Sequence, residues 1–126
     1  AFLAEYSRMD IALDTVPYNG GTTSCDALWM GVPVVTLPGG RFSSRMGASV
    51  LRTVGLNDFI AGNVDDYVRI ATSLAADTAR LLKLRSSIRN QMSDSHLCAP
   101  EEFTQNFEVI LQEIVDQEAG SENLIR

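Results

Sequence analysis

Apolar and polar residues alternate differently in the two halves of this chain, and the first half has the pattern of an α/β unit. Residues 10–14 and 33–37 are short apolar runs bounded by carboxylates or turn residues, which is typical of buried strands. Between them, residues 23–31 predict a helix that ends at Gly31, with Pro33 shortly beyond. A strand, a helix and a strand in this order predict two parallel strands joined by a right-handed crossover.

The rest of the chain is dominated by apolar positions at helical spacing. We predict four helices, over residues 42–54, 64–76, 78–92 and one that Pro100 opens. Asn63 and Asp77 stand where N-cap residues are expected for the second and third of these helices. Residues 58–60 are predicted to form a short strand or turn that closes the α/β half.

Each of these helices carries an apolar face, and we expect the faces to pack into the core. In the last helix this face consists of Phe103, Phe107, Ile110, Leu111, Ile114 and Val115. The tail over residues 120–126 is expected to be frayed. At 126 residues the chain has the length of a single domain. Within it we expect an α/β part over residues 1–62 and a helical part over residues 63–119.

The segment between the first strand and the first helix carries the most specific chemical signal. Its turn-forming residues are Pro17, Asn19, Gly20 and Gly21. Thr22 or Thr23 can cap the helix that follows through a hydroxyl group. Asp26 lies three residues past Thr23, which is the spacing of a capping box with Asp in place of Glu or Gln.

A Gly-rich turn that leads into a helix presents backbone N–H groups and the positive end of the helix dipole, and a diphosphate fits such a site. Glycine pairs and threonine caps also occur where α/β domains bind nothing, so a structural role for residues 20–23 stays open. The segment lacks the Gly-Lys-Ser/Thr of a Walker-type loop and the glycine spacing of the dinucleotide-binding fingerprint. A nucleotide would therefore be bound in another way.

Other candidate ligand residues lie at the same edge of the predicted sheet. Arg41 and Arg45 follow the second strand, at the carboxyl edge where open α/β sheets bind ligands. Either arginine could pair with a phosphate or be an ion-paired surface residue. Tyr18 stands at the tip of the turn, where its ring could touch a base or a sugar, or cover the turn.

Charge and composition argue against several other classes of function. The formal net charge of -6 disfavours nucleic-acid binding, which depends mainly on Lys and Arg. His96 is the single histidine, and Cys25 and Cys98 lie far apart in sequence, so a metal site is not expected. No apolar stretch has membrane-spanning length and no secretory signal is recognisable, so a cytoplasmic location is the default expectation.

The run from Asp10 to Gly40, DIALDTVPYNGGTTSCDALWMGVPVVTLPGG, closely resembles the C-terminal catalytic region of the O-linked N-acetylglucosamine (O-GlcNAc) transferase family. This family includes the plant SPINDLY proteins and many bacterial enzymes with tetratricopeptide repeats. The similarity continues through residues 44–49 and 54–56, and more loosely to the terminal helix. It covers nearly the whole chain.

The resemblance implies an inverting GT-B glycosyltransferase, in which two Rossmann-like halves face each other and the C-terminal half holds the nucleotide sugar. The α/β part of this chain would then be its nucleotide-binding part. Thr22 and Thr23 match the threonine pair that contacts the donor diphosphate, in the loop that Gly20 and Gly21 help to form. Asp26 matches the acidic residue that contacts the ribose. No metal and no cofactor beyond the sugar donor are implied.

The chain departs from the family pattern at two of these positions. Gly21 stands where some members carry a histidine before the threonine pair. Phe2 stands where many members have a histidine near the nucleobase, and its ring can stack there but cannot donate a hydrogen bond. The family's basic residue for the diphosphate and its catalytic groups would precede Ala1. We therefore expect no catalytic residue in this chain and no activity of the chain alone.

The implied function is that of a protein O-glycosyltransferase acting on Ser or Thr hydroxyls. The donor would be UDP-GlcNAc, as in the GlcNAc-transferring members, or GDP-fucose, as in the SPINDLY branch, to which residues 5–10 and 18–23 are at least as close. The implied partners are an upstream half with tetratricopeptide repeats and an acceptor protein. The uncovered sheet edge is expected to favour a homodimer. A non-catalytic nucleotide- or protein-binding domain that retains the fold is the alternative.

Overall fold

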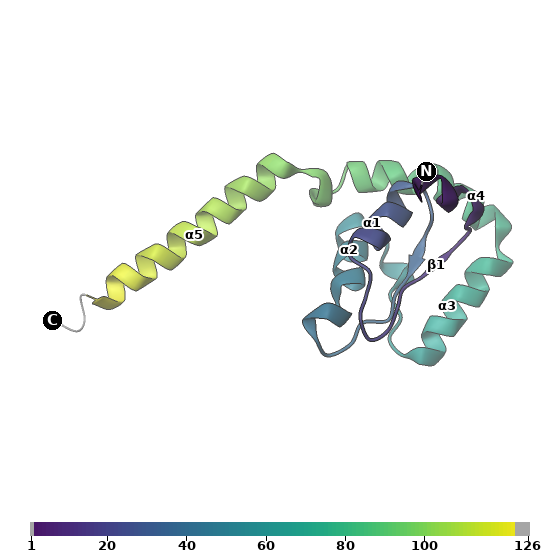
Figure 1. The fold of residues 1–126 in the computed structure, drawn as a ribbon, viewed down its shortest axis with the longest axis horizontal. Helices are drawn as coiled ribbons and strands as arrows, with labels where there is room; N and C mark the ends of the chain where they lie inside the picture. The colour runs from purple at the N-terminus through teal and green to yellow at the C-terminus, as the bar shows by residue number, and fades with distance from the viewer. Residues whose placement is uncertain (1, 123–126) are drawn as a thin grey trace.

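A two-stranded parallel sheet lies within the globular part of the computed structural model, which describes residues 2–122 (Figure 1). The elements are η1 (Phe2–Arg8), β1 (Ala12–Leu13), α1 (Thr22–Trp29), β2 (Val34–Val35), η2 (Phe42–Ser44), α2 (Met46–Val54), η3 (Asn57–Phe59), α3 (Val64–Ala76), α4 (Thr78–Ser93), η4 (His96–Cys98) and α5 (Pro100–Glu122), with η marking 3-10 helices. The helices α1 and α2 lie on one side of the strands and α3 on the other, while α5 extends away from the rest.

β1 and β2 pair in parallel, with Ala12 opposite Val34, which confirms the predicted parallel pair with a helix between its strands. Thr36 forms a further parallel bridge with Ile60, so a third chain segment lies beside β2. This bridge is the short strand or turn expected over residues 58–60. Within the described residues β1 has a strand partner on one side only.

Both strands are shorter than predicted, because the chain leaves the ladder soon after it enters. The last ladder hydrogen bond of β1 runs from Asp14 N to Val35 O at 2.9 Å. Beyond this point the Asp14 side chain binds N–H groups of its own turn rather than another strand. The apolar pattern therefore locates both paired segments but overstates how far they pair. It marks β2 correctly as buried, whereas the prediction of a buried first strand is wrong, because Leu13 is 57% exposed.

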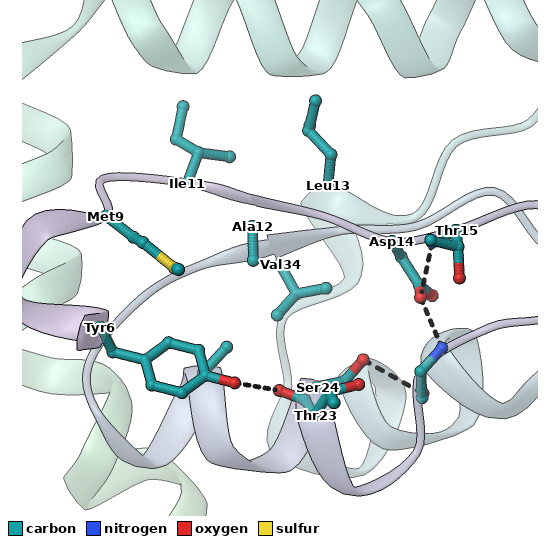
Figure 2. A pocket seen from close by; sticks show the side chains of 12 residues that line it. Tyr6, Met9, Ile11, Ala12, Leu13, Asp14, Thr15, Thr23, Ser24 and Val34 are labelled. Atoms are coloured by element: carbon teal, nitrogen blue, oxygen red, sulfur yellow. Dashed lines mark hydrogen bonds between the residues drawn. The ribbon is translucent and has the colours of Figure 1, made fainter. Parts of the chain in front are cut away.

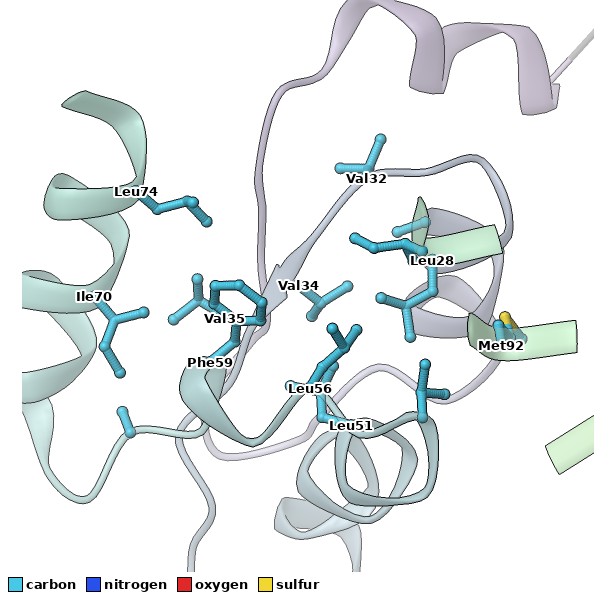
Figure 3. Packing of buried hydrophobic residues seen from close by; sticks show 14 of the residues in the cluster. Leu28, Val32, Val34, Val35, Leu51, Leu56, Phe59, Ile70, Leu74 and Met92 are labelled. Atoms are coloured by element: carbon cyan, nitrogen blue, oxygen red, sulfur yellow. The ribbon is translucent and has the colours of Figure 1, made fainter. Parts of the chain in front are cut away.

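The core lies on both faces of β2, since successive strand residues point to opposite sides. Val34 points toward α1 and α2, and Val35 points toward α3 (Figure 3). Both valines are fully buried, as expected for a parallel strand covered by helices on two faces. Burial of one such side chain stabilises the fold by about 1.5–3 kcal/mol.

The helices α3 and α4 follow the prediction closely, including their caps. The side chain of Asn63 accepts a hydrogen bond from Asp66 N at 2.8 Å at the start of α3. The side chain of Asp77 accepts from Arg80 N at 2.9 Å at the start of α4. Local capping chemistry is enough to place these two helix starts.

The single helix predicted over residues 42–54 is wrong, because the chain forms η2 and then α2. The Ser44 hydroxyl accepts from Arg41 N at 3.1 Å and donates to Arg41 O at 2.8 Å, which closes a separate turn. The carbonyl of Ser43 accepts from Asn19 N at 2.9 Å. A continuous helix would direct that carbonyl to Gly47 N. A contact with the preceding loop thus breaks the helix.

The expectation that the apolar face of the last helix packs into the core is also wrong. Phe103 is 67% exposed and Ile110 is 53% exposed, and α5 projects from the rest of the structure. The space around β2 is already filled by α1 to α4, so the apolar face of α5 has no cover among the described residues. The helix continues to Glu122, residues 123–126 lie outside the described part, and the fraying of the tail stays a prediction. No helix within residues 2–122 combines the length and apolarity needed to cross a membrane.

This arrangement predicts opposite outcomes for two large-to-small substitutions in the isolated chain. Leu51 is 1% exposed, so Leu51→Ala should lower the free energy of unfolding by about 2–5 kcal/mol. Ile110 is 53% exposed on α5, so Ile110→Ala should change it by less than about 0.5 kcal/mol. Urea denaturation followed by circular dichroism measures both. Similar losses for the two variants would contradict the described core.

Candidate functional site

Two loops meet where β1 and β2 end, and the first of them leads into α1. The first loop covers residues 14–21 and the second covers residues 36–45. They are joined by the hydrogen bond from Asn19 N to Ser43 O at 2.9 Å. Because parallel strands end at the same edge of a sheet, this is the carboxyl edge at which α/β proteins bind ligands.

Asp14 ends β1 and organises the first loop from a buried position. Its side chain is the acceptor for Thr15 N at 3.0 Å and for Gly20 N at 2.7 Å, both at Oδ1 (Figure 2). Its Oδ2 accepts from the hydroxyl of Thr36 at 2.6 Å. The residue is 8% exposed, so both carboxylate oxygens are used inside the protein.

A close approach of α2 completes this arrangement. A Cβ atom built on Gly47 would lie 2.1 Å from Asp14 Oδ2 and 2.6 Å from Thr36 Oγ1. Only glycine therefore fits at this point in the first turn of α2. Sequence analysis did not single out Asp14 or Gly47 as site residues, although a carboxylate directly between a buried strand and a Gly-rich turn was a usable signal.

Asn19 holds the middle of the same loop. Its side-chain amide donates to Thr15 O at 2.8 Å, and the Thr15 hydroxyl donates to the carbonyl of Tyr18. The residue is fully buried, and its Oδ1 has no hydrogen-bond partner among the described residues. The Val16–Pro17 peptide bond in this loop is cis. The backbone of the loop is thus held at several points by its own side chains.

The predicted capping box at the start of α1 is wrong. The N-cap is Gly21, and no side chain accepts a hydrogen bond from the first turn. Thr22 and Thr23 already lie inside the helix, so neither is the N-cap residue. Asp26 therefore has no N-cap threonine with which to form a capping box. As a consequence, the first N–H groups of α1 are not occupied by a side-chain cap, which is the condition for anion binding at a helix start.

The structure brings together the main residues predicted to bind a donor. Gly20, Gly21, Thr22 and Thr23 form one continuous turn into α1. Thr22 and Thr23 are exposed, and Asp26 is half-buried one helical turn further on. A Cβ on Gly20 would lie 2.5 Å from Thr23 Oγ1, so the hydroxyl is packed directly against this glycine.

A pocket of about 470 Å³ lies beside this turn, between η1, β1 and α1. Its lining includes Tyr6, Met9, Asp14, Gly20, Thr23 and Ser24 (Figure 2). No Lys, Arg or His lines it among the described residues. An anionic ligand here would have to rely on N–H groups, hydroxyls and the helix dipole of this chain.

The first segment, η1, was not predicted, yet Tyr6 closes one end of this pocket. The Tyr6 hydroxyl donates to Thr23 O at 3.4 Å. Burial raises the pKa of Tyr6, and the nearby negative charge of Asp26 raises it further. Tyr6 is therefore a neutral donor near the start of α1 at neutral pH.

The remaining candidates are placed differently. Phe2 packs edge-on against Tyr6, with ring centroids 5.8 Å apart, and is 66% exposed near the pocket. Tyr18 is 68% exposed on the first loop. Arg45 lines a separate groove of about 530 Å³ with Phe42, Met46 and Val50, so the structure does not bring it into the pocket beside α1. Within residues 2–122, no three His, Cys, Asp or Glu side chains are grouped so as to hold a metal ion.

A parallel α/β unit with a Gly-rich loop and an uncapped helix start at its carboxyl edge defines a Rossmann-like α/β unit. The comparison with known sequences gives its family. Residues 6–107 match glycosyl transferase family 41, and the chain belongs to that family. This establishes the resemblance to the O-GlcNAc transferase and SPINDLY family.

Curated relatives agree with this assignment. The chain is 50% identical over 103 residues to a probable UDP-N-acetylglucosamine–peptide N-acetylglucosaminyltransferase SPINDLY of Petunia hybrida, which covers 82% of this chain and 11% of the relative. It is 33% identical over 102 residues to the UDP-N-acetylglucosamine–peptide N-acetylglucosaminyltransferase of Caenorhabditis elegans, covering 81% of this chain and 9% of the relative. The chain thus spans about a tenth of the length of these relatives.

A solved structure confirms the fold class. A mutant of the Thermobaculum terrenum O-GlcNAc transferase superposes with a TM-score of 0.82 at 39% sequence identity. The match covers 89% of this chain and 22% of that chain. The chain therefore has the α/β fold of part of a GT-B glycosyltransferase, as expected.

The close approach of Gly47 to Asp14 gives a prediction with an internal control. Gly47→Ala would force a Cβ against two hydrogen-bonded oxygen atoms, so it should destabilise the isolated chain by about 1–3 kcal/mol. Gly40 has no atom within 4 Å of a built Cβ, so Gly40→Ala should change stability by less than about 0.5 kcal/mol. Urea denaturation compares the two, and equal stabilities would contradict the described packing around Asp14.

Proposed function

We propose that this chain is the donor-binding part of a protein O-glycosyltransferase. The observation that carries the proposal is the start of α1, where the first N–H groups have no side-chain cap and two threonine residues are exposed. This start belongs to a chain whose curated relatives are named as UDP-N-acetylglucosamine–peptide N-acetylglucosaminyltransferases. Uncapped N–H groups at a helix start bind the phosphate groups of nucleotides.

Each site residue has a proposed role. The N–H groups and hydroxyls of Thr22 and Thr23 bind the donor diphosphate, and Gly20 and Gly21 allow the ligand to approach the backbone. Asp26 accepts hydrogen bonds from the ribose hydroxyls. Phe2 and Tyr18 are exposed aromatic side chains that can contact the base.

In the proposed reaction, a Ser or Thr hydroxyl of an acceptor protein attacks the anomeric carbon of the donor sugar. The bond from this carbon to the diphosphate breaks, with inversion at the carbon. Negative charge then develops on the leaving diphosphate, where the α1 N–H groups and dipole stabilise it without a metal ion. The catalytic base and the basic partner of the diphosphate are proposed to lie outside this chain, in an upstream half.

UDP-GlcNAc is the proposed donor, because the relatives carry this donor in their names. GDP-fucose is the second candidate. It is favoured by the Tyr-X-Gly-X-Thr-Thr pattern over residues 18–23, which resembles the SPINDLY branch at least as closely. A comparison of UDP and GDP affinities separates the two donors.

We further propose that residues 1–126 form one domain of a larger cytoplasmic protein with tetratricopeptide repeats. The open edge of β1 and the apolar face of α5 are surfaces that the rest of such a protein would cover. In the isolated chain the open edge of β1 is proposed to pair with a second copy. A non-catalytic nucleotide- or protein-binding domain is the alternative, and it would bind the nucleotide without turnover.

The threonine pair provides the direct test of the site. In a full-length transferase carrying this domain, replacing Thr22 and Thr23 together by Val should weaken nucleoside diphosphate binding by about 1–3 kcal/mol, the range for hydrogen bonds to a charged group. Isothermal titration calorimetry with UDP and GDP measures this loss. Asp26→Asn should weaken binding less than Asp26→Ala, because the amide keeps an acceptor oxygen.

Stability is the control for these variants. Because neither threonine caps α1, the double variant should unfold within about 0.5 kcal/mol of the parent protein. Unchanged affinity for the preferred nucleotide in the double variant would show that the loop is structural. The proposed site would then be wrong.

Catalysis is tested by comparing the chain alone with the whole enzyme. Purified residues 1–126 should transfer no sugar to a Ser/Thr peptide from either UDP-GlcNAc or GDP-fucose, while the full-length protein should transfer one of them. Radiolabelled donors measure this transfer. Turnover by the chain alone would refute the division of the active site, and nucleotide binding without turnover in the full-length protein would favour the non-catalytic alternative.

A further inference from the structure

We propose that Asp14 is a positioning residue for donor binding: it holds the loop before α1 in the conformation that presents the diphosphate-binding N–H groups. The proposal rests on the proposed function of that loop. Asp14 acts through the backbone of Gly20 and does not itself contact the donor.

The Asp14 carboxylate accepts a hydrogen bond from the loop just before α1. Gly20 N donates to Asp14 Oδ1 at 2.7 Å, which ties the end of β1 to a residue directly before the helix. The carbonyl of the same glycine accepts from the hydroxyl of Ser24 at 3.1 Å, inside the first turn of α1. Gly20 is therefore fixed through both its N–H and its carbonyl. Thr22, the first residue of α1, follows two positions later.

Asp14 is itself held by hydrogen bonds from two separate parts of the fold. Its Oδ2 accepts from the hydroxyl of Thr36, just past β2, at 2.6 Å. Its main-chain carbonyl accepts from the hydroxyl of Tyr67, on α3, at 2.9 Å. Burial raises the pKa of Tyr67, and the charge of Asp14 raises it further, so the hydroxyl keeps its proton and stays a donor at neutral pH. Because Asp14 is held in place by Thr36 and Tyr67, its hydrogen bond with Gly20 N can fix the conformation of the loop.

The contacts that Asp14 already makes leave it little capacity to bind the donor directly. Asp14 lines the pocket beside α1 but is only 8% exposed, and its two carboxylate oxygens already accept from two N–H groups and one hydroxyl. A carboxylate that approached a diphosphate would also repel it. None of the described ion pairs supplies Asp14 with a cation, so its partners are the dipoles of the loop itself.

The test compares Asp14→Ala with Asp14→Asn in a full-length transferase carrying this domain. Alanine leaves Gly20 N without its acceptor, so UDP or GDP should bind roughly tenfold or more weakly. The side-chain oxygen of asparagine can still accept hydrogen bonds from Gly20 N and Thr15 N. Its NH2 group then faces Thr36, whose hydroxyl can rotate to accept a hydrogen bond from it. Its affinity should stay within about threefold of the parent protein. Isothermal titration calorimetry measures both dissociation constants.

Steady-state kinetics separates positioning from general destabilisation. Asp14→Ala should raise the KM for the sugar donor and leave the KM for the acceptor peptide unchanged. Asp77→Ala is the matched control, because it removes the cap of α4 and so lowers stability at a place that is not part of the loop. Its nucleotide affinity should equal that of the parent protein.

Each outcome decides the proposal. It is overturned if Asp14→Ala binds nucleotide as tightly as Asp77→Ala, which would make Asp14 merely structural. It is also overturned if Asp14→Asn loses as much affinity as Asp14→Ala. The negative charge of Asp14, and not its hydrogen bond with Gly20 N, would then determine nucleotide affinity. If Asp14→Ala does not fold, Tyr67→Phe takes its place: it should weaken nucleotide binding by about threefold, and unchanged affinity would overturn the proposal.

The same experiment distinguishes failure of the proposed function. Normal nucleotide binding in the Thr22→Val, Thr23→Val double variant would refute the diphosphate site as a whole. Weakened binding in that variant together with normal binding in Asp14→Ala would refute only the positioning role.

Discussion

The hydrogen bond from Gly20 N to Asp14 Oδ1, at 2.7 Å, joins the end of the first strand to the start of the first helix. Most of the local structure depends on it. The Asp14 carboxylate is buried without a described cation. Thr15 N and the Thr36 hydroxyl also donate hydrogen bonds to it, and Gly47 has no side chain that would collide with it. A buried carboxylate without such partners would cost several kcal/mol, which makes this loop conformation hard to exchange for another.

Local chemistry was sufficient to predict part of the fold. The caps Asn63 and Asp77 placed α3 and α4, and the apolar runs around residues 10–14 and 33–37 gave the parallel pair. These features depend on residues close in sequence, or on the apolar character of a short segment. The family was also recognisable from one long motif, because that motif includes the loop and both flanking strands.

The errors have a common physical origin in contacts between segments distant in sequence. The helix over residues 42–54 is broken because Ser43 O accepts from Asn19 N. The capping box fails because the N-cap of α1 is Gly21, one or two residues before the threonines that were expected to cap it. An apolar face such as that of α5 shows that a surface needs cover, but its sequence does not say which part of the protein supplies it. The role of Asp14 likewise becomes visible only when Thr36 and Gly47 are seen beside it.

The described part of the chain offers N–H groups, hydroxyls and a helix dipole to an anion, but no cation lines the pocket beside α1. Diphosphate recognition by this chain is therefore proposed to depend on the loop that Asp14 holds in place. A crystal structure of a full-length transferase carrying this domain, with a nucleoside diphosphate bound, tests this most directly. We expect a phosphate oxygen about 3 Å from the N atom of Thr22 or Thr23, with the hydrogen bond from Gly20 N to Asp14 retained. A diphosphate bound away from the start of α1, or a loop in which Gly20 has left Asp14, would contradict it.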